Sequence, residues 1–381
     1  MSIPSCILPI LFLLVLGTSQ HAYHDRITLK KLIEIAVSKS FSWNDEHFLL
    51  CTNRWGQINN DRFSLYSAII AAIALNRTLI LPSFLIKGRR DLLDNIYGFQ
   101  WESSTNIMTL HNSFRGNLRI LNSSSYHACP NINFVIEFEK YGPHPPLYDG
   151  LHPNIKYKNT PYITIPEHVK LYSFDDTGQF HANAIRLLSS FQDKCLGVNH
   201  FLGMVPSYDY ITHPPVLQPI WNMVMKALAP IESLQSSVIS YMKNHIKTTP
   251  FWSVHVRLGD FCEKFTGRCD HIGDSYMQYL KKMSVLPQCG NITNIYLMTN
   301  DFTHPLINII KQTYNVYTYT HPYNLPIISG VRSVDQVFIE IGIASYARCF
   351  LGDRESTMSY EIFTRRMVDR NMNENTSFFV V

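Results

Sequence analysis

The spacing of apolar residues near the start of the chain predicts a strand, a helix and a second strand. An unbroken apolar run over 48–51 has the length of a buried strand, and a polar loop containing glycine follows it. Residues 61–75 have helical length and strong helix formers, and a second short apolar run occupies 79–82. This order predicts a βαβ unit of a parallel sheet. Ligands of such sheets bind at the carboxyl ends of the strands, which here means the loop after residue 51.

The same alternation returns after residue 250. Short apolar runs predict strands over 252–257, 294–301, 315–320 and 348–352. Helical patterns fall between or after them, over 304–313, 333–347 and 358–368. Residues 221–246 have a helical pattern with a break at Pro230, whereas the long stretch 85–220 shows little periodicity and is assigned to the first domain with long loops. The simplest architecture is two α/β domains with a cleft between them.

Composition narrows the classes of ligand. The chain has 381 residues, of which 46% are apolar and 16% charged, so it is long enough for two domains with sizeable cores. The formal net charge of +4 is not gathered into runs, which argues against a nucleic-acid partner. A local anionic ligand, such as a nucleoside diphosphate, remains compatible with this charge.

Residues 1–20 have the features of a secretory signal peptide. Their apolar run from Ile7 to Leu16 is too short to span a bilayer, and small residues follow it. No Lys or Arg precedes the run, so a short membrane anchor is the alternative; no other segment approaches a transmembrane span. Sequons for N-glycosylation agree with a secretory route and occur at Asn76, Asn122, Asn291 and Asn375.

Cysteine usage adds to this expectation. If Cys6 leaves with the signal peptide, seven cysteines remain, and in an oxidising lumen most should pair while at least one stays free. Cys262 and Cys269 are close enough in sequence for a local pair. The spacing of Cys and His residues matches no zinc motif.

Polar residues follow the first and the third of the predicted apolar strands. In the loop at 55–62, Gly56 permits close backbone approach, and Asn59 and Asn60 precede a helix. Turn and N-cap chemistry explains such a loop equally simply. In the strand at 252–257, His255 and Arg257 lie two apart and therefore point to the same face.

Arg257 and the later segment at 352–359 both suit an anion. A guanidinium on a rigid strand presents a planar fork to phosphate oxygens, although an ion pair with a carboxylate such as Asp260 is the alternative. Ser356 and Thr357 stand at the start of a helix, where backbone N–H groups and the helix dipole favour negative charge. A plain N-cap is the simpler explanation of that pair. Two such sites in one α/β half together predict a nucleoside diphosphate site.

Three segments, taken in order and spacing, resemble the GDP-fucose protein O-fucosyltransferase family. They are NRWGQINNDRFSLYSAIIAAIALNRTLILPSF, VHVRLGDF and FLGDRESTMSYEI. The resemblance implies an α/β fold of the GT-B type, with two Rossmann-like domains whose parallel sheets face each other across a cleft. It also implies an acceptor-side domain over 42–225, a GDP-fucose-binding domain over 226–370, and a place in the lumen of the endoplasmic reticulum or Golgi.

The resemblance implies an inverting transfer of fucose from GDP-fucose to Ser or Thr hydroxyls, with no cofactor and no required metal. The chain contains no D-x-D carboxylate pair, which is consistent with that expectation. Arg257 would be the catalytic residue, holding the β-phosphate and stabilising the departing diphosphate. Ser356 and Thr357 would bind the same phosphate, and His255 would lie against the nucleotide.

The remaining implied contacts come from both halves of the chain. Glu340, twelve positions before Gly352, would help to hold the nucleotide, with Asp335 as the alternative. From the other domain, Gly56 with Asn59 or Asn60 would approach the sugar phosphate.

The general base that an inverting attack requires is not assigned. One branch of the family, which acts on thrombospondin-type repeats, has a Glu just before its glycine loop. The corresponding residues here are Asn53, Arg54 and Trp55, so Asp61 and Asp260 are the candidates.

Three functional hypotheses follow. The first is a protein O-fucosyltransferase whose acceptors are folded secretory domains, either EGF-like or thrombospondin-type repeats. The second is a fucosyltransferase acting on glycans. The third is a catalytically silent luminal protein that binds nucleotide or glycoproteins, an interpretation that the missing carboxylate favours and the retained Arg257 opposes.

Overall fold

The computed structural model divides the chain into two compact units, residues 1–229 and 230–381. It describes 47–52, 59, positions within 65–80, 120–121, 129, 134–138, 162–165, 191–199, 225–226, 228–247, 249–258, 268–319, 334–354 and 356–380. Each unit contains a sheet whose paired strands all run parallel. The predicted arrangement of two parallel α/β domains is therefore confirmed. The domain limits 42–225 and 226–370 and the signal peptide stay predictions.

The first unit contains a six-stranded sheet in the order β3-β2-β1-β6-β4-β5. Its strands are β1 (Phe48–Thr52), β2 (Thr78–Ile80), β3 (Ile120–Leu121), β4 (Phe134–Phe138), β5 (Tyr162–Ile165) and β6 (Cys195–Asn199). The predicted βαβ unit is present, because β1 and β2 pair in parallel and the described residues between 59 and 75 are helical. The last four strands lie in the stretch where the sequence shows little periodicity.

Arg77, in the NRTL segment, connects three parts of the first unit. Its guanidinium donates to the carbonyl oxygens of Phe48 at 3.2 Å, Asp193 at 2.7 Å and Phe191 at 2.6 Å. Burial lowers the pKa of Arg77, and the nearby Asp193 carboxylate opposes that shift. This arginine therefore links the starts of β1 and β2 to the chain that enters β6, which gives it a structural role.

The second unit has the strand order of a nucleotide-binding fold. Its five-stranded sheet runs β11-β10-β7-β8-β9. The strands are β7 (Trp252–Val256), β8 (Asn294–Thr299), β9 (Asn315–Tyr317), β10 (Cys349–Asp353) and β11 (Ser377–Val380). The chain builds outward from β7 through β8 to β9, then returns to place β10 on the other side of β7. That reversal is a topological switch point, where open α/β sheets bind ligands at the carboxyl ends of their strands.

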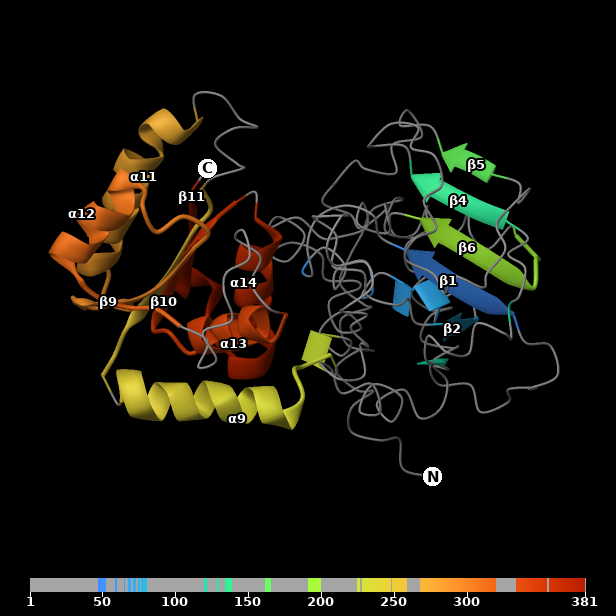
Figure 1. Cartoon of the computed structure of the whole chain (residues 1–381), viewed down its shortest axis with the longest axis horizontal. Helices are drawn as coiled ribbons and strands as arrows, with labels where there is room; N and C mark the ends of the chain where they lie inside the picture. Colours follow the sequence, from blue (N-terminus) through green and yellow to red (C-terminus); the bar gives the residue numbers. More distant parts are fainter. Residues whose placement is uncertain are drawn as a thin grey trace, which may run out of the picture. The chain divides into compact units, whose positions relative to one another are not determined.

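Helices cover both faces of this sheet (Figure 1). The helical elements are α9 (Glu232–Tyr241), its π-helical continuation η5 (Met242–Ile246), α11 (Arg268–Val285), α12 (Pro305–Thr313), α13 (Val334–Ser345), α14 (Thr357–Arg370) and the short η6 (Glu374–Thr376). Figure 1 shows α11 and α12 on one face and α13 and α14 on the other, with α9 running along α13. The predicted break at Pro230 is observed, because α9 starts just after it.

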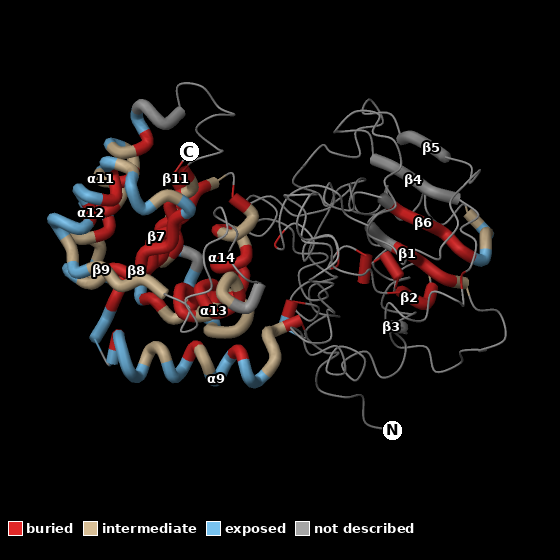
Figure 2. The backbone as a smooth tube through the Cα atoms, in the orientation of Figure 1, coloured by how far each residue is buried: buried red, intermediate tan, exposed pale blue. Residues whose placement is uncertain are grey.

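The side chains of β7 alternate between these two faces, and all five are buried (Figure 2). Trp252, Val254 and Val256 belong to the apolar core that α11 and α12 cover. Ser253 and His255 point the other way, since the Ser253 hydroxyl donates to the Ala344 carbonyl of α13 and the His255 ring contacts Ser359 of α14. The period-two pattern of the sequence therefore puts the histidine on the face of α13 and α14.

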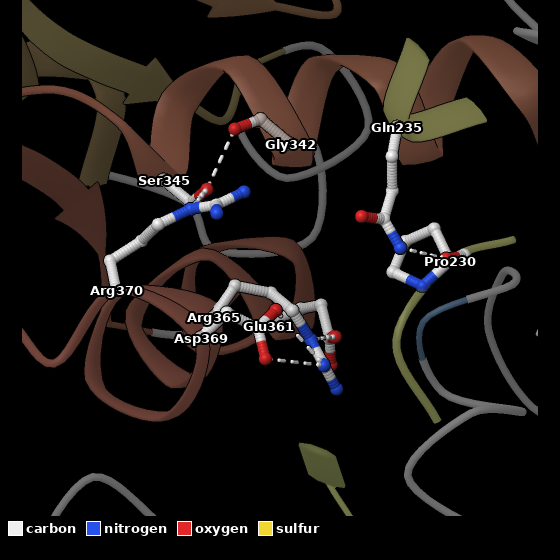
Figure 3. Close-up of polar contacts among 8 residues, drawn as sticks. All are labelled: Pro230, Gln235, Gly342, Ser345, Glu361, Arg365, Asp369 and Arg370. Carbon is white, nitrogen blue, oxygen red and sulfur yellow. Dashed lines mark hydrogen bonds and ion pairs between the residues drawn. The ribbon is translucent and has the colours of Figure 1, made fainter. Parts of the chain in front are cut away.

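Charged side chains pair along α14, as Figure 3 shows for Arg365, Glu361 and Asp369. Arg365 donates to Glu361 at 2.7 Å and pairs with Asp369 at 3.2 Å, and both Glu361 and Arg365 are almost fully buried. Arg366 donates to the carbonyl of Ala347 and to the Ser377 hydroxyl, so it connects α14 to the starts of β10 and β11. Burial lowers the pKa of Arg366 to about 10. These contacts explain why arginines occupy the inner face of this helix.

Among the residues that the structure describes, two disulfides join Cys129 to Cys195 and Cys289 to Cys349. They agree with the expectation that most cysteines pair. The proposed Cys262–Cys269 pair and the free thiol concern side chains outside the described part of the chain. Cys349 is the first residue of β10, so the second disulfide lies at the amino edge of its sheet, opposite the edge where ligands bind.

Candidate functional site

The ends of β7 and β10 lie side by side at the switch point of the second unit. The two strands pair in register, with Trp252 opposite Cys349 and Val254 opposite Leu351. The predicted His255–Arg257 segment is therefore next to the predicted segment that begins at Gly352. The structure thus brings together two polar segments that are far apart in the sequence.

His255 is buried and held from both faces of the sheet. Its ring Nδ1 lies 2.7 Å from the Ser359 hydroxyl oxygen, and its carbonyl oxygen accepts a hydrogen bond from the Tyr276 hydroxyl at 2.7 Å. The Ser359 oxygen also accepts the backbone N–H of Asp353 at 2.9 Å. A single serine therefore links the end of β7, the end of β10 and the first turn of α14.

Arg257 follows β7 and is partly exposed. The next residue, Leu258, is held by the side chain of Asn300, which accepts the Leu258 N–H at 2.8 Å and donates to the Leu258 carbonyl at 2.7 Å. Asn300 directly follows β8. The backbone that carries Arg257 is thus fixed at the carboxyl edge of the sheet, while Asp260, its suggested ion-pair partner, lies outside the described residues.

Ser356 occupies the N-cap position of α14, but its side chain makes no capping hydrogen bond. Ser356 therefore has the position expected of an N-cap but lacks the side-chain hydrogen bond of one. The first turn, which begins with Thr357, contains no acidic residue. The start of a helix carries backbone N–H groups and the positive end of the helix dipole, and both favour a nearby anion.

Gly352 allows α14 to approach β10 closely. A Cβ atom at this position would lie 2.6 Å from the Phe350 ring and 2.8 Å from the Ser359 Cβ. Only glycine fits between these groups without displacement. The sequence Phe350-Leu351-Gly352 thus has a packing explanation, since the glycine lets the start of α14 lie directly beside the end of β10.

Glu340 lies on α13 and is 2% exposed. It accepts a 3.4 Å hydrogen bond from Gln336 and is near the phenol of Tyr241. Burial raises the pKa of Tyr241 to about 12, and the charges of Glu340, Tyr317 and Tyr319 add to the rise. The predicted nucleotide contact is therefore a buried carboxylate among tyrosines, and the side chain of its alternative, Asp335, is outside the described part.

Asn59 is the described member of the site predicted in the first unit. It is helical and 5% exposed, and within the described part of the chain its Oδ1 has no hydrogen-bond partner. A buried amide oxygen without a partner is uncommon and calls for an explanation such as a missing ligand. Gly56, Asn60 and Asp61 lie outside the described residues.

Candidate membrane-spanning helices and metal sites are both absent from the part of the chain that the structure describes. No helix there is both long and apolar enough to cross a bilayer. Nor do the described His, Cys, Asp and Glu side chains form a group of three that could hold a metal ion.

Solved structures share this architecture. The crystal structure of POFUT1 in complex with GDP-fucose is similar with a TM-score of 0.55 at 13% identity, over 88% of this chain and 99% of that one. POFUT1 in complex with GDP has a TM-score of 0.54, covering 90% of this chain and all of the other. The fold is that of POFUT1. The predicted α/β fold of the GT-B type is therefore confirmed.

A second fucosyltransferase is less similar. NodZ from Bradyrhizobium has a TM-score of 0.48 at 11% identity, over 84% of this chain and 92% of that one. No protein-family model matches the sequence, and no curated protein does. At these identities the likeness establishes the fold, and the activity has to be argued from the site.

Ser359 and Asn300 are the residues that sequence reasoning missed. Ser359 is two residues beyond the Ser-Thr pair and inside a predicted helix, where a serine gives no indication of a functional role. Asn300 ends a predicted strand, and a polar residue after a strand at the ligand edge is the signal that could have identified it. Both residues organise the backbone of the predicted site by contacts that no local pattern encodes.

Proposed function

We propose that this protein is a glycosyltransferase that uses GDP-fucose as donor and transfers fucose to Ser or Thr hydroxyls of folded secretory proteins. The observation that supports the proposal is that β7, which leads to Arg257, and β10, which leads to the start of α14, are neighbouring strands at the switch point of one sheet. The segments that meet there supply three features that suit a diphosphate: a guanidinium, two hydroxyl residues and the N-terminal N–H groups of a helix.

Each proposed role follows from charge development in the reaction. Loss of GDP places negative charge on the β-phosphate, and fixed donors aimed at that charge lower the barrier. Arg257 supplies the charged donor, with Ser356 and Thr357 beside it, while His255 and Glu340 contact the rest of the nucleotide. Fucose would then leave GDP as an oxocarbenium-like species and be captured by the acceptor hydroxyl with inversion.

The proposal also includes residues of the first unit. In this proposal Gly56 with Asn59 or Asn60 approaches the sugar phosphate, and the buried Asn59 Oδ1 without a partner supports a ligand contact there. The general base stays unassigned, with Asp61 and Asp260 as candidates. The fold shared with POFUT1, whose crystals contain GDP-fucose, supports the donor.

The proposed setting is the lumen of the endoplasmic reticulum or Golgi, with a cleaved signal peptide and no stable membrane span. The two disulfides support an oxidising compartment. Folded EGF-like or thrombospondin-type repeats are the proposed acceptors, and no metal is required because Arg257 and the helix N–H groups take over charge stabilisation.

Calorimetry with GDP, GDP-fucose, GDP-mannose and UDP tests the donor. Binding of GDP and GDP-fucose but not UDP is expected, and no binding of any GDP species would refute the proposal. Arg257→Ala should lower transfer and donor hydrolysis by about 10²–10³-fold, the cost of losing one such donor. Arg257→Lys retains the positive charge but not the planar guanidinium. Its rate of transfer should lie between those of Arg257→Ala and the unmodified protein.

Arg348→Ala is the matched control, because this exposed arginine precedes β10 at the opposite edge of the same sheet. It should leave turnover unchanged. Incubation with EGF-like repeats, thrombospondin-type repeats and free glycans then separates the acceptor classes. Transfer to glycans alone would replace the protein acceptor by a glycan, and GDP binding without transfer or hydrolysis would indicate a silent binding protein.

A further inference from the structure

The hydroxyl of Ser359 lies between two groups whose hydrogen-bonding roles differ. It accepts the N–H of Asp353 at 2.9 Å, and that N–H can only donate. It also lies 2.7 Å from His255 Nδ1, which can donate or accept according to the tautomer. Ser359 is fully buried, and within the described part of the chain its side chain makes these two hydrogen bonds.

The proton of the Ser359 hydroxyl decides between the tautomers. If His255 carried a proton on Nδ1, the serine oxygen would accept twice and its own proton would be buried without an acceptor. If Nδ1 is unprotonated, the hydroxyl donates to it while accepting from Asp353, and both contacts of the serine are satisfied. Buried donors without acceptors are costly, so the second arrangement is favoured. The same count opposes a doubly protonated ring, which burial also disfavours.

We propose that Ser359 is a positioning residue, which holds His255 as the neutral tautomer with its proton on Nε2. The imidazole then presents an N–H donor from Nε2 and no net charge. The Tyr276 hydroxyl fixes the backbone of His255 from the other face, and Gly352 fixes the position of Ser359 by close packing. The ring is thus held in both orientation and protonation.

The consequence for ligand binding rests on the proposed function, whereas the tautomer does not. An Nε2–H donor suits an acceptor oxygen of a nucleoside diphosphate, such as a phosphate or ribose oxygen. The opposite tautomer would present a lone pair there and repel that oxygen. Ser359 would therefore act on GDP affinity through His255 without touching the nucleotide.

Nitrogen NMR of the full chain labelled with ¹⁵N-histidine tests the assignment, with His255 identified from the signals lost in His255→Gln. At about pH 8, above the ordinary pKa of histidine, we expect His255 to show an unprotonated Nδ1 and a protonated Nε2. A proton on Nδ1, or on both nitrogens, would overturn the proposal. This measurement needs no variant of Ser359 to fold.

Ser359→Ala should leave a mixture of tautomers, and Ser359→Thr, which keeps the hydroxyl, should restore the Nε2–H form. An unchanged tautomer in Ser359→Ala would remove the role of this serine. Ser253→Ala is the matched control, since Ser253 is a buried serine on the same face of β7 that donates to Ala344 instead. It should leave the His255 signals unchanged.

GDP affinity separates this proposal from the proposed function. Loss of one hydrogen bond predicts about a tenfold weaker GDP affinity in Ser359→Ala and recovery in Ser359→Thr. If His255 has its proton on Nε2 but the unmodified protein does not bind GDP, only the proposed function is refuted. If the protein binds GDP but His255 has its proton on Nδ1, only the role of Ser359 is refuted.

Discussion

Removing the side chain of Asn300 should loosen the residue beside Arg257. Asn300 holds both the N–H and the carbonyl of Leu258, at 2.8 Å and 2.7 Å. A hydrogen bond contributes about 0.5–1.5 kcal/mol net, so two predict a loss of about 1–3 kcal/mol in Asn300→Ala. Asn300 is exposed, so water can replace part of the interaction and the lower half of that range is expected.

Urea unfolding followed by circular dichroism measures this loss, and calorimetry with GDP measures its effect on the site. Because Arg257 precedes Leu258, GDP affinity should fall about tenfold along with stability, which corresponds to roughly 1.4 kcal/mol. Asn300→Asp retains an acceptor for the Leu258 N–H but no donor for its carbonyl, so its stability should be intermediate.

Asn294→Ala is the matched control, because Asn294 begins the same strand at the opposite edge and its side chain makes only long hydrogen bonds among the described residues: it donates to the Pro250 carbonyl at 3.4 Å and accepts from the Asn315 amide at 3.4 Å. Its stability and GDP affinity should stay near those of the unmodified protein. If Asn300→Ala loses stability but binds GDP normally, the fixed backbone at Leu258 does not position Arg257. Unchanged stability would show that the two hydrogen bonds contribute nothing.

Three further variants test other parts of the second unit. Gly352→Ala should lower the free energy of unfolding by about 1–3 kcal/mol through overpacking. The control Gly273→Ala should not, because its Cβ would meet its nearest neighbour at 3.9 Å. Equal effects of the two variants in thermal unfolding would contradict the close approach of α14 to β10. Glu361→Ala should cost about 3 kcal/mol because it leaves Arg365 buried with a weaker partner, and Asp369→Ala should cost less in the same urea titration. When the protein is expressed in a secretory host, it should carry a glycan at the exposed Asn291. Asn291→Gln should therefore remove one of the mobility shifts seen on deglycosylation, while GDP binding persists. If this variant and the unmodified protein show the same shifts, the result counts against the secretory route.

Elements with unbroken apolar runs could be predicted from the sequence. β1, β8 and β10 are strands of parallel sheets and show as nearly continuous hydrophobic segments, whereas in β7 apolar residues alternate with Ser253 and His255. The helix α11 is absent from the predicted elements, although Ile272, Tyr276, Leu280 and Met283 repeat at helical spacing along it. Its many polar residues and an internal glycine hide that spacing.

The order of the strands could not be predicted, and the site depends on it. His255 and Ser359 suggest no relation in the sequence, because their contact arises only when β10 takes its place beside β7. Predicting Arg257 and the Ser356–Thr357 pair required only local patterns, namely a strand end and a helix start. The residues that hold them act across the fold: Ser359 leaves no local signature, and Asn300 is marked only by its place directly after a strand.

The strand order also has a consequence for how the protein folds. β7, β8 and β9 can pair as they leave the ribosome, because each neighbours the next in sequence, but β7 gains its other neighbour only when Cys349 and the residues after it have been made. Closing that long loop is entropically expensive and slow, so the pairing of β10 is expected to be a late folding event. The edge formed by β7 and β10 is then complete only in a fully folded unit, and nucleotide binding there would report that the chain has finished folding.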